Sequence, residues 1–130
     1  AVVPVAAREV FKRIANILDD AKAKQLAAAH GGAVDRALFA SAGNVEWRLA
    51  DAVDAAQPAI TRAIGQRGYR DLFAILAELG PTVAAFFDKG GVMVMDPDAR
   101  LRDNRLALLA NLIAPFAKVA DMRALAGGAA

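Results

Sequence analysis

The stretch DPDARLRDNRLALLANLIAPF, residues 96–116, decides the fold class of this chain. Asp98 is a good helix N-cap, and the apolar residues that follow recur every three or four positions, as in a helix with about 100° per residue. The pattern predicts a helix from Asp98 to about Ile113. Pro115 should bend or end it, and a further turn or two should reach Leu125.

Most of the remaining chain is also predicted to be helical. The first predicted helix runs from Pro4 to Asp20 or as far as Ala29, and a loop over 31–43 with a helical turn at Asp35 to Leu38 follows it. The next helix is capped by Asn44, kinked or split at Pro58 and ended by Gly65 and Gly68. A helix from Arg70 to Leu79, a break at Gly80-Pro81, a short helix from Thr82 to Phe87 and a loop from Lys89 to Pro97 complete the predicted elements. Only the run 91–95 has strand character, and it has no obvious partner. We therefore expect an all-α helical bundle, with residues 1–130 forming a single domain cut from the C-terminal part of a longer chain.

Composition excludes several functional classes. Hydrophobic residues make up 57% of the 130 residues and charged residues 23%, which is enough apolar material for one real core. No window approaches the roughly 18 apolar residues of a membrane span, so we expect no membrane association. There is no cysteine and a single histidine, His30, so thiolate chemistry is excluded and most histidine-based metal and triad chemistry is removed. The pairs Asp19/Asp20 and Asp51/Asp54 lack the other groups that a hydrolase needs, so we predict no catalytic residue and no metal site.

Two arginines stand on the wrong face of the helix over 98–113. Arg102 and Arg105 fall within its apolar arc, and an unpaired buried charge is costly. In one interpretation they pair with Asp88, Asp96 or Asp98 and pin the preceding loop to the helix. In the other interpretation, at least one of these arginines points into a groove at the N-terminal end (the mouth) of the helix and donates to an anionic or polar ligand. Asn104 lies just off the arc and could line the same mouth.

Two further groups of polar residues suit a nucleic acid but also suit a solvated surface. Arg62, Arg67 and Arg70 lie close together with Tyr69 among them, and basic residues beside an aromatic can bind a strand. More often such a stretch is a solvated helix end. On the first helix, Lys12, Arg13 and Asn16 lie together on the polar face. The net charge of only +2 does not by itself indicate a nucleic-acid-binding protein.

Several segments resemble one bacterial family in order and spacing. They are Phe86-Phe87-Asp88-Lys89, Val92-Met93-Val94-Met95, Leu101-Arg102-Asp103-Asn104-Arg105-Leu106, Val119-Ala120-Asp121 and, near the start, Lys12-Arg13-Ile14-Ala15-Asn16-Ile17-Leu18. Together they resemble the C-terminal end of the bacterial glycyl-tRNA synthetase β subunit. The middle of the chain, from about 20 to 67, matches poorly, and Gly90-Gly91 is an insertion relative to the family pattern.

The resemblance implies a DALR-type anticodon-binding domain that would position glycine tRNA for aminoacylation in the cytoplasm. Catalysis would belong to a separate α subunit, which would bind ATP and Mg²⁺ and form a heterotetramer with the β subunit, so this chain would carry no cofactor. Glycine anticodons share two adjacent cytosines, whose edges offer acceptors at O2 and N3 and a donor at N4. The residues expected to contact tRNA are Asp88, Lys89, Arg102, Asn104 and Arg105 on one wall, Lys12, Arg13 and Asn16 on the other, and Arg67 and Arg70 for phosphates.

The alternative function is a protein–protein interaction module. A helical bundle of this kind could dock on the rest of the synthetase, either the β subunit or the α subunit. A large apolar surface patch without a contiguous positive groove would favour that alternative.

Overall fold

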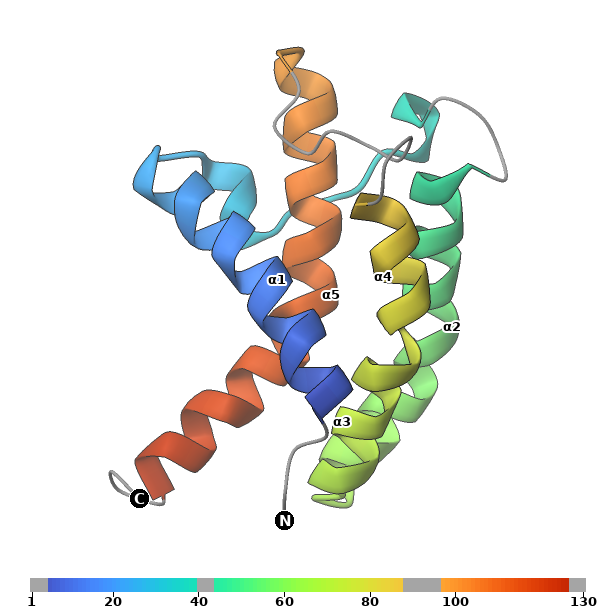
Figure 1. Cartoon of the computed structure of the whole chain (residues 1–130), viewed down its shortest axis with the longest axis vertical. Coiled ribbons are helices and arrows are strands. Elements are labelled where there is room, and N and C mark those ends of the chain that lie inside the picture. Colours follow the sequence, from blue (N-terminus) through green and yellow to red (C-terminus); the bar gives the residue numbers. More distant parts are fainter. Residues whose placement is uncertain (1–4, 40–43, 88–96, 127–130) are drawn as a thin grey trace.

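The computed structural model of the chain describes residues 5–39, 44–87 and 97–126, and in the last helix it describes side chains as far as Lys118. All regular structure in these ranges is helical, which confirms the predicted all-α class (Figure 1). The elements are α1 (Val5–Ala23), the 3-10 turns η1 (Ala27–His30) and η2 (Arg36–Leu38), α2 (Val45–Gly65), α3 (Tyr69–Glu78), α4 (Gly80–Phe87) and α5 (Ala99–Ala126). The strand-like run 91–95 lies outside the described residues.

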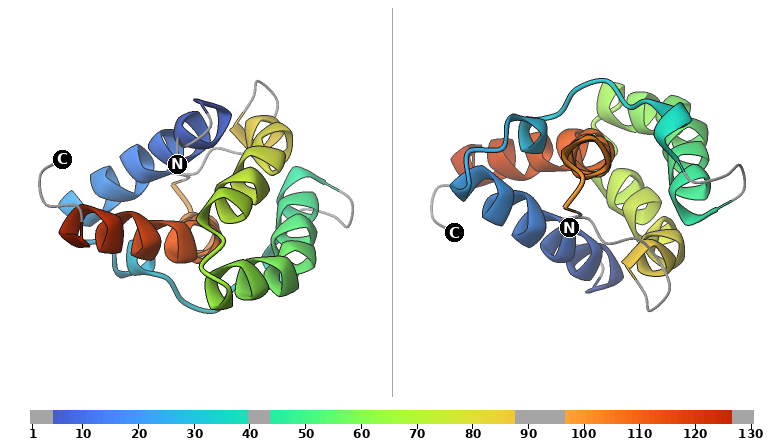
Figure 2. Two further views of the ribbon diagram at one scale, coloured as in Figure 1. Left: turned by 90° about the horizontal axis from the view of Figure 1, so that it is seen from below. Right: turned by 90° about the horizontal axis from the view of Figure 1, so that it is seen from above.

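The helices pack as a bundle around the first half of α5. Viewed along that half, α5 lies between α1 and η1 on one side and the group formed by α2, α3 and α4 on the other (Figure 2). α1 also packs on α3, and α2 packs on α3 and α4. In the second half, α5 turns away from this direction, as Figure 1 shows. Pro115 lies inside the helix and removes one helical hydrogen bond there, so it bends α5 without ending it.

The core is made of the apolar stripes that the periodicity predicts. From α5 it takes six large side chains, all at most 6% exposed: Leu106, Leu108, Leu109, Leu112, Ile113 and Phe116. The stripe of α1 contributes Val10, Ile14 and Leu18, which pack into the same cluster. Because every helix supplies one apolar face to a shared interior, the bundle forms one continuous core.

Helix ends follow local signals. Asn44 caps α2 as predicted, since its side chain accepts a hydrogen bond from the backbone N–H of Trp47 at 2.9 Å. α2 is not split at Pro58 and runs unbroken to Gly65. α1 ends at Ala23, between the two predicted ends, because Gln25 adopts a left-handed backbone with φ of 60°.

A strap of residues 31–39 crosses α5 and joins α1 to α2. Its predicted turn is present as η2, where the Asp35 side chain accepts from the backbone N–H of Ala37. The strap begins with Gly31 and Gly32 at φ of 108° and 148°, a region that favours glycine. Asn111 of α5 donates to the carbonyl oxygen of Gly32 at 2.7 Å, which holds the start of the strap on the helix.

Candidate nucleic-acid interface

A groove of about 700 Å³ lies between α1 and α4 and brings together three residues predicted to contact tRNA. Lys12, Arg13 and Asn16 all line its α1 side, spaced so that they share one face of that helix. We call this feature the α1–α4 groove. Its complete lining is Ala6, Glu9, Val10, Lys12, Arg13, Asn16, Ala77, Gly80, Pro81, Val83 and Ala84.

The α1–α4 groove has an apolar floor and a polar rim on one side only. The helices approach closely at the floor, where a Cβ placed on Gly80 would lie 3.3 Å from Cγ2 of Val10. The α4 side carries only small or apolar residues, whereas α1 supplies two cations, one amide and the carboxylate of Glu9. An apolar floor can take the flat face of a base, and a rim of cations and an amide can reach phosphates and base edges.

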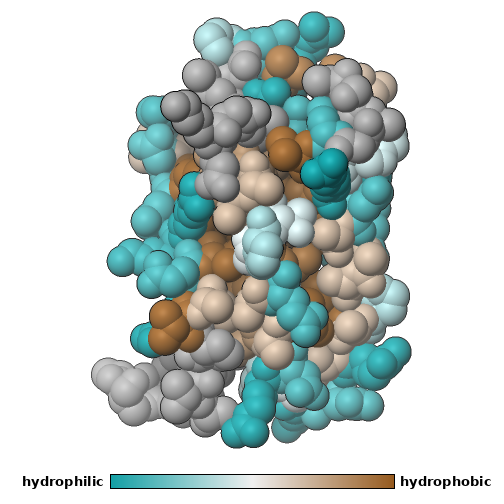
Figure 3. Space-filling view, turned by 45° about the vertical axis from the view of Figure 1, so that its right-hand side comes forward, coloured by the Kyte–Doolittle hydropathy of each residue, from teal (hydrophilic) through white to brown (hydrophobic). Residues whose placement is uncertain are grey.

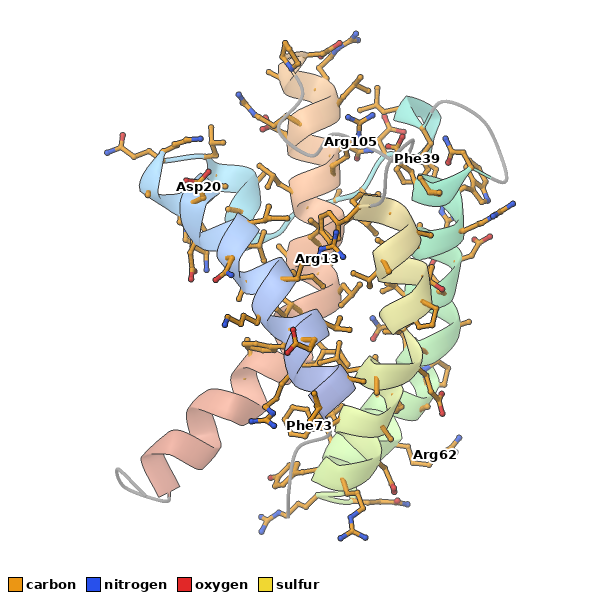
Figure 4. All side chains as sticks on the ribbon, viewed as in Figure 1. Arg13, Asp20, Phe39, Arg62, Phe73 and Arg105 are labelled. Carbon is orange, nitrogen blue, oxygen red and sulfur yellow. The ribbon has the colours of Figure 1, made fainter. Side chains whose placement is uncertain are left out.

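Arg13 extends from α1 toward α4 (Figure 4) and covers an aromatic ring of that helix. Its guanidinium carbon lies 4.6 Å from the ring centroid of Phe87, a cation–π contact. Phe87 in turn meets the buried Phe86 edge-on, with ring centroids 5.4 Å apart. Phe87 is one of the functional candidates that sequence reasoning missed. The signal was its helical spacing from Gly80, Val83 and Ala84, which puts it on the groove side of α4.

The predicted phosphate-binding residues Arg67 and Arg70 lie at the turn between α2 and α3. This turn is a Schellman motif, in which Gly68 donates to the Ala63 carbonyl at 2.7 Å and Arg67 donates to that of Ile64 at 3.1 Å. Arg67 occupies the left-handed position of the motif with φ of 55°, where glycine is usual. Both arginines are exposed, and Arg62 nearby is exposed at the same end of the bundle (Figure 4).

Arg105 is buried and forms an ion pair with Glu46 of α2. Its Nε lies 3.3 Å from Oε2 of Glu46 and its Nη2 3.4 Å from Oε1, and the two side chains are only 10% and 2% exposed. Glu46 was missed at the sequence level, where only aspartates were considered as partners. The signal was available, because Glu46 lies on the same helical stripe as the buried residues Leu49 and Val53.

Asn104 is likewise committed to an internal contact. Its side chain accepts from the backbone N–H of Asp35 at 2.7 Å and donates to the Asp35 carbonyl at 2.9 Å. Arg102, a quarter exposed, donates through Nε to its neighbour Asp103 at 3.0 Å. The sequence predicted a shared mouth for these donors, but the structure turns Asn104 and Arg105 toward other protein groups. Asp88 and Lys89, predicted for the same wall, lie outside the described residues.

A small hollow beside Asn104 has a rim of mixed charge. It measures about 290 Å³, and its charged lining residues are Asp35, Arg100 and Asp103. Two carboxylates against one guanidinium make this hollow a poorer host for phosphate than the α1–α4 groove. RNA contact by Asn104 and Arg105 stays a prediction, beside the structural role that these distances show.

The acidic pair Asp51 and Asp54 holds the strap to α2. Arg36 donates to Asp51 at 2.7 Å and to Asp54 at 2.6 Å, and its guanidinium carbon lies 5.1 Å from the centre of the Trp47 ring. Hydrogen bonds to Asp51 and then Asp54 raise the pKa of the Arg36 guanidinium above its ordinary value. These two carboxylates therefore neutralise a structural arginine.

The described part of the chain contains neither a group of metal ligands nor a membrane-spanning helix. No group of three or more histidine, cysteine, aspartate or glutamate side chains there could hold a metal ion. No helix within the described ranges is long and apolar enough to cross a membrane.

Comparison with known proteins places the chain in a family. The model of the DALR anticodon binding domain matches residues 8–119. The chain is 39% identical over 115 residues to a glycine–tRNA ligase β subunit of Nitratidesulfovibrio vulgaris strain Miyazaki F, a match covering 88% of this chain and 16% of the relative. It is 40% identical over 116 residues to that of Pseudomonas fluorescens, covering 89% and 16%. It is 34% identical over 110 residues to that of Rickettsia felis, covering 85% and 15%. No solved structure matches significantly.

The described part of the chain is thus an all-α helical bundle with a polar-rimmed groove between α1 and α4. Within that class, the chain belongs to the DALR anticodon-binding domain family. The matched region contains every lining residue of the groove except Ala6. The chain spans about a sixth of the length of the curated relatives it matches, since the matches cover 15–16% of each relative.

We predict that the Glu46–Arg105 pair is needed as a pair. Glu46→Gln replaces the carboxylate that pairs with the buried guanidinium by a neutral amide, and we expect it to lower the free energy of unfolding by roughly 3 kcal/mol. The double variant Glu46→Leu/Arg105→Met removes both charges and should be less destabilised than Glu46→Gln. Urea unfolding followed by circular dichroism measures both. Equal destabilisation of the two variants would contradict a paired role.

We also predict an acid-sensitive cap at the start of α5. The backbone N–H of Arg100 donates to Asp98 at 2.9 Å and, followed by the Arg100 side chain, lowers the pKa of this carboxyl. A lowered folded-state pKa adds stability above the unfolded value of about 3.9, and this stability is lost as the pH falls through the folded-state pKa. Wild type should therefore melt above Asp98→Asn at pH 6, and the difference should shrink toward pH 3. A Tm difference between wild type and Asp98→Asn that stays the same from pH 6 to pH 3 would show that the charge of Asp98 does not stabilise the fold.

Proposed function

We propose that this chain binds the anticodon loop of glycine tRNA as the anticodon-binding domain of a glycine–tRNA ligase β subunit. The observation that carries the proposal is the α1–α4 groove, which lies within the matched family region and combines an apolar floor with a cationic and amide rim. Anticodon bases are unpaired, so they can be splayed out, stacked and contacted at their edges.

The chemistry of the rim suits the two cytosines of a glycine anticodon. The amide of Asn16 can donate to cytosine O2 or N3, and its oxygen can accept from N4. Lys12 is exposed beside it and supplies a point charge for a phosphate of the same strand. Because both residues are on a helix, their spacing is held by the fold.

A second contact would come from the turn between α2 and α3. Arg67 and Arg70 are exposed there, and we infer that they bind phosphates of the tRNA. Arg67 keeps a left-handed backbone that glycine would adopt at lower cost.

The proposal extends to the assembly, since the relatives are named as β subunits of a glycine–tRNA ligase. The chain would work as part of a longer β subunit in the cytoplasm, paired with an α subunit in a heterotetramer. ATP and Mg²⁺ would be bound by the α subunit. In this arrangement the domain would contribute tRNA recognition and no catalytic group.

The alternative, a docking module, rests on the apolar surface around α4. Figure 3 shows a band of apolar residues through the middle of this face, with hydrophilic side chains along both edges. Pro81 and Ala85 are exposed there. The family match favours anticodon binding over docking, because a docking module does not need the rim formed by Lys12, Arg13 and Asn16.

We predict that the chain binds a synthetic anticodon stem-loop of glycine tRNA with salt-dependent affinity. Replacing both anticodon cytosines should weaken binding. The double variant Lys12→Ala/Asn16→Ala should weaken it by at least about tenfold, since it removes a charge contact and a hydrogen bond. Lys22→Ala, at the exposed far end of α1, is the matched control and should bind as wild type. Fluorescence anisotropy measures the affinity of wild type for both stem-loops and of each variant for the natural stem-loop. Equal affinity of wild type for the natural and the cytosine-free stem-loops would contradict anticodon recognition.

We predict opposite effects of Arg67→Gly on stability and on binding. Glycine relieves the left-handed backbone, so the free energy of unfolding should not fall, whereas affinity for the stem-loop should drop and the salt dependence should weaken by the equivalent of about one phosphate contact. Gln25→Gly is a close control, because Gln25 holds the same position of a Schellman motif at the end of α1, with φ of 60°. It should leave affinity unchanged. Loss of affinity for the stem-loop in both Arg67→Gly and Gln25→Gly would show that the change of backbone conformation, and not the loss of the Arg67 side chain, weakens binding.

A further inference from the structure

The contact between Arg13 and Phe87 lies beside the α1–α4 groove, which Arg13 lines. On α4, Phe87 follows the groove-lining residues Gly80, Val83 and Ala84 at helical spacing, one turn beyond Ala84. Arg13 comes from the opposite helix and lies over that ring at 4.6 Å. The groove is therefore flanked by a cation–π pair whose two members come from different helices.

The arginine of this pair is presented to solvent in a held position. Arg13 is exposed, whereas Phe87 is half-buried and rests on the fully buried Phe86. A guanidinium is planar and stacks on aromatic faces, and contact with the ring reduces the freedom of an otherwise mobile side chain. A surface that is already ordered loses less conformational entropy when a ligand binds to it.

We infer that Arg13, supported by Phe87, is a stacking platform for one unpaired pyrimidine or purine base of the bound RNA. The base lies on the side of the guanidinium that faces away from the ring, so that Phe87, Arg13 and the base form a continuous stack. Asn16, one helical turn further along α1, then lies within the same groove to contact the edge of a neighbouring base. This inference rests on the proposed function and adds how one base is held.

Stacking of a base on Arg13 requires a planar side-chain group, whereas charge attraction to a phosphate does not. An ammonium group neutralises a phosphate as well as a guanidinium does, but it has no plane on which a base can stack. Arg13→Lys therefore separates the two roles, because it keeps the charge and removes the plane. Arg8→Lys is the matched control, since Arg8 is an exposed arginine on the same helix outside the groove lining.

The test uses the whole chain and glycine anticodon stem-loops carrying 2-aminopurine at each unpaired anticodon position in turn. Stacking quenches the fluorescence of this base. With wild type and with Arg8→Lys, we expect quenching at one position on binding. With Arg13→Lys we expect about tenfold weaker binding, an unchanged salt slope and loss of that quenching at saturating protein.

A second variant tests the support beneath the arginine. Phe87→Leu keeps an apolar side chain but removes the ring, and it should reproduce the loss of quenching while circular dichroism shows a folded domain. The double variant Arg13→Lys/Phe87→Leu should bind no more weakly than the weaker single variant, because the two residues act as one unit.

The outcomes separate this inference from the proposed function. If wild type binds and Arg13→Lys keeps both affinity and quenching, the stacking platform is wrong while anticodon binding stands. If Arg13→Lys keeps the quenching while Arg13→Ala lowers both the affinity and the salt slope, Arg13 is a phosphate contact and the platform is again wrong. If wild type does not bind the stem-loop, the proposed function itself fails.

Discussion

The buried ion pair between Glu46 and Arg105 is the interaction on which the arrangement of the bundle depends. Removing two charges from water is costly, and each charge of this pair offsets part of that cost for the other. The pair therefore fixes the first turn of α2 against α5. One residue earlier on α5, Asn104 holds both backbone groups of Asp35, so the strap is registered against the same helix. Three segments far apart in the sequence are thus joined at one place.

This joint is the reason why we place the proposed RNA contacts in the α1–α4 groove first, ahead of the start of α5. Donors that are bonded to Glu46 and Asp35 would have to exchange those partners to contact RNA, which costs free energy. The α1–α4 groove carries no such conflict, because its rim belongs to the polar face of α1 and its floor to the packing of α1 on α4. One amphipathic helix therefore serves the core with one face and the groove with the other.

The distribution of charge matters more than its total. A net charge of +2 is small, and several cations are used internally, with Arg36 held by two aspartates and Arg105 by a glutamate. Within the described ranges, Lys12 and Arg67 form no ion pair and stand at two separate places on the surface. Such an arrangement gives a few directed contacts, which suit selection of one loop better than a uniform positive surface does.

The sequence by itself determined the all-α class, the Asn44 cap, the turn in the strap and the apolar stripe of each helix. These features depend on residues within a few positions of one another, so periodicity and capping residues reveal them. Only the tertiary structure decided that Arg105 meets Glu46, 59 positions away, that Asn104 meets Asp35, 69 positions away, and that Arg13 covers Phe87. A charged residue on the apolar face of a predicted helix indicates, from the sequence alone, that it needs a partner. The partner's identity depends on which helix faces lie opposite each other, and this is settled only when the whole core packs.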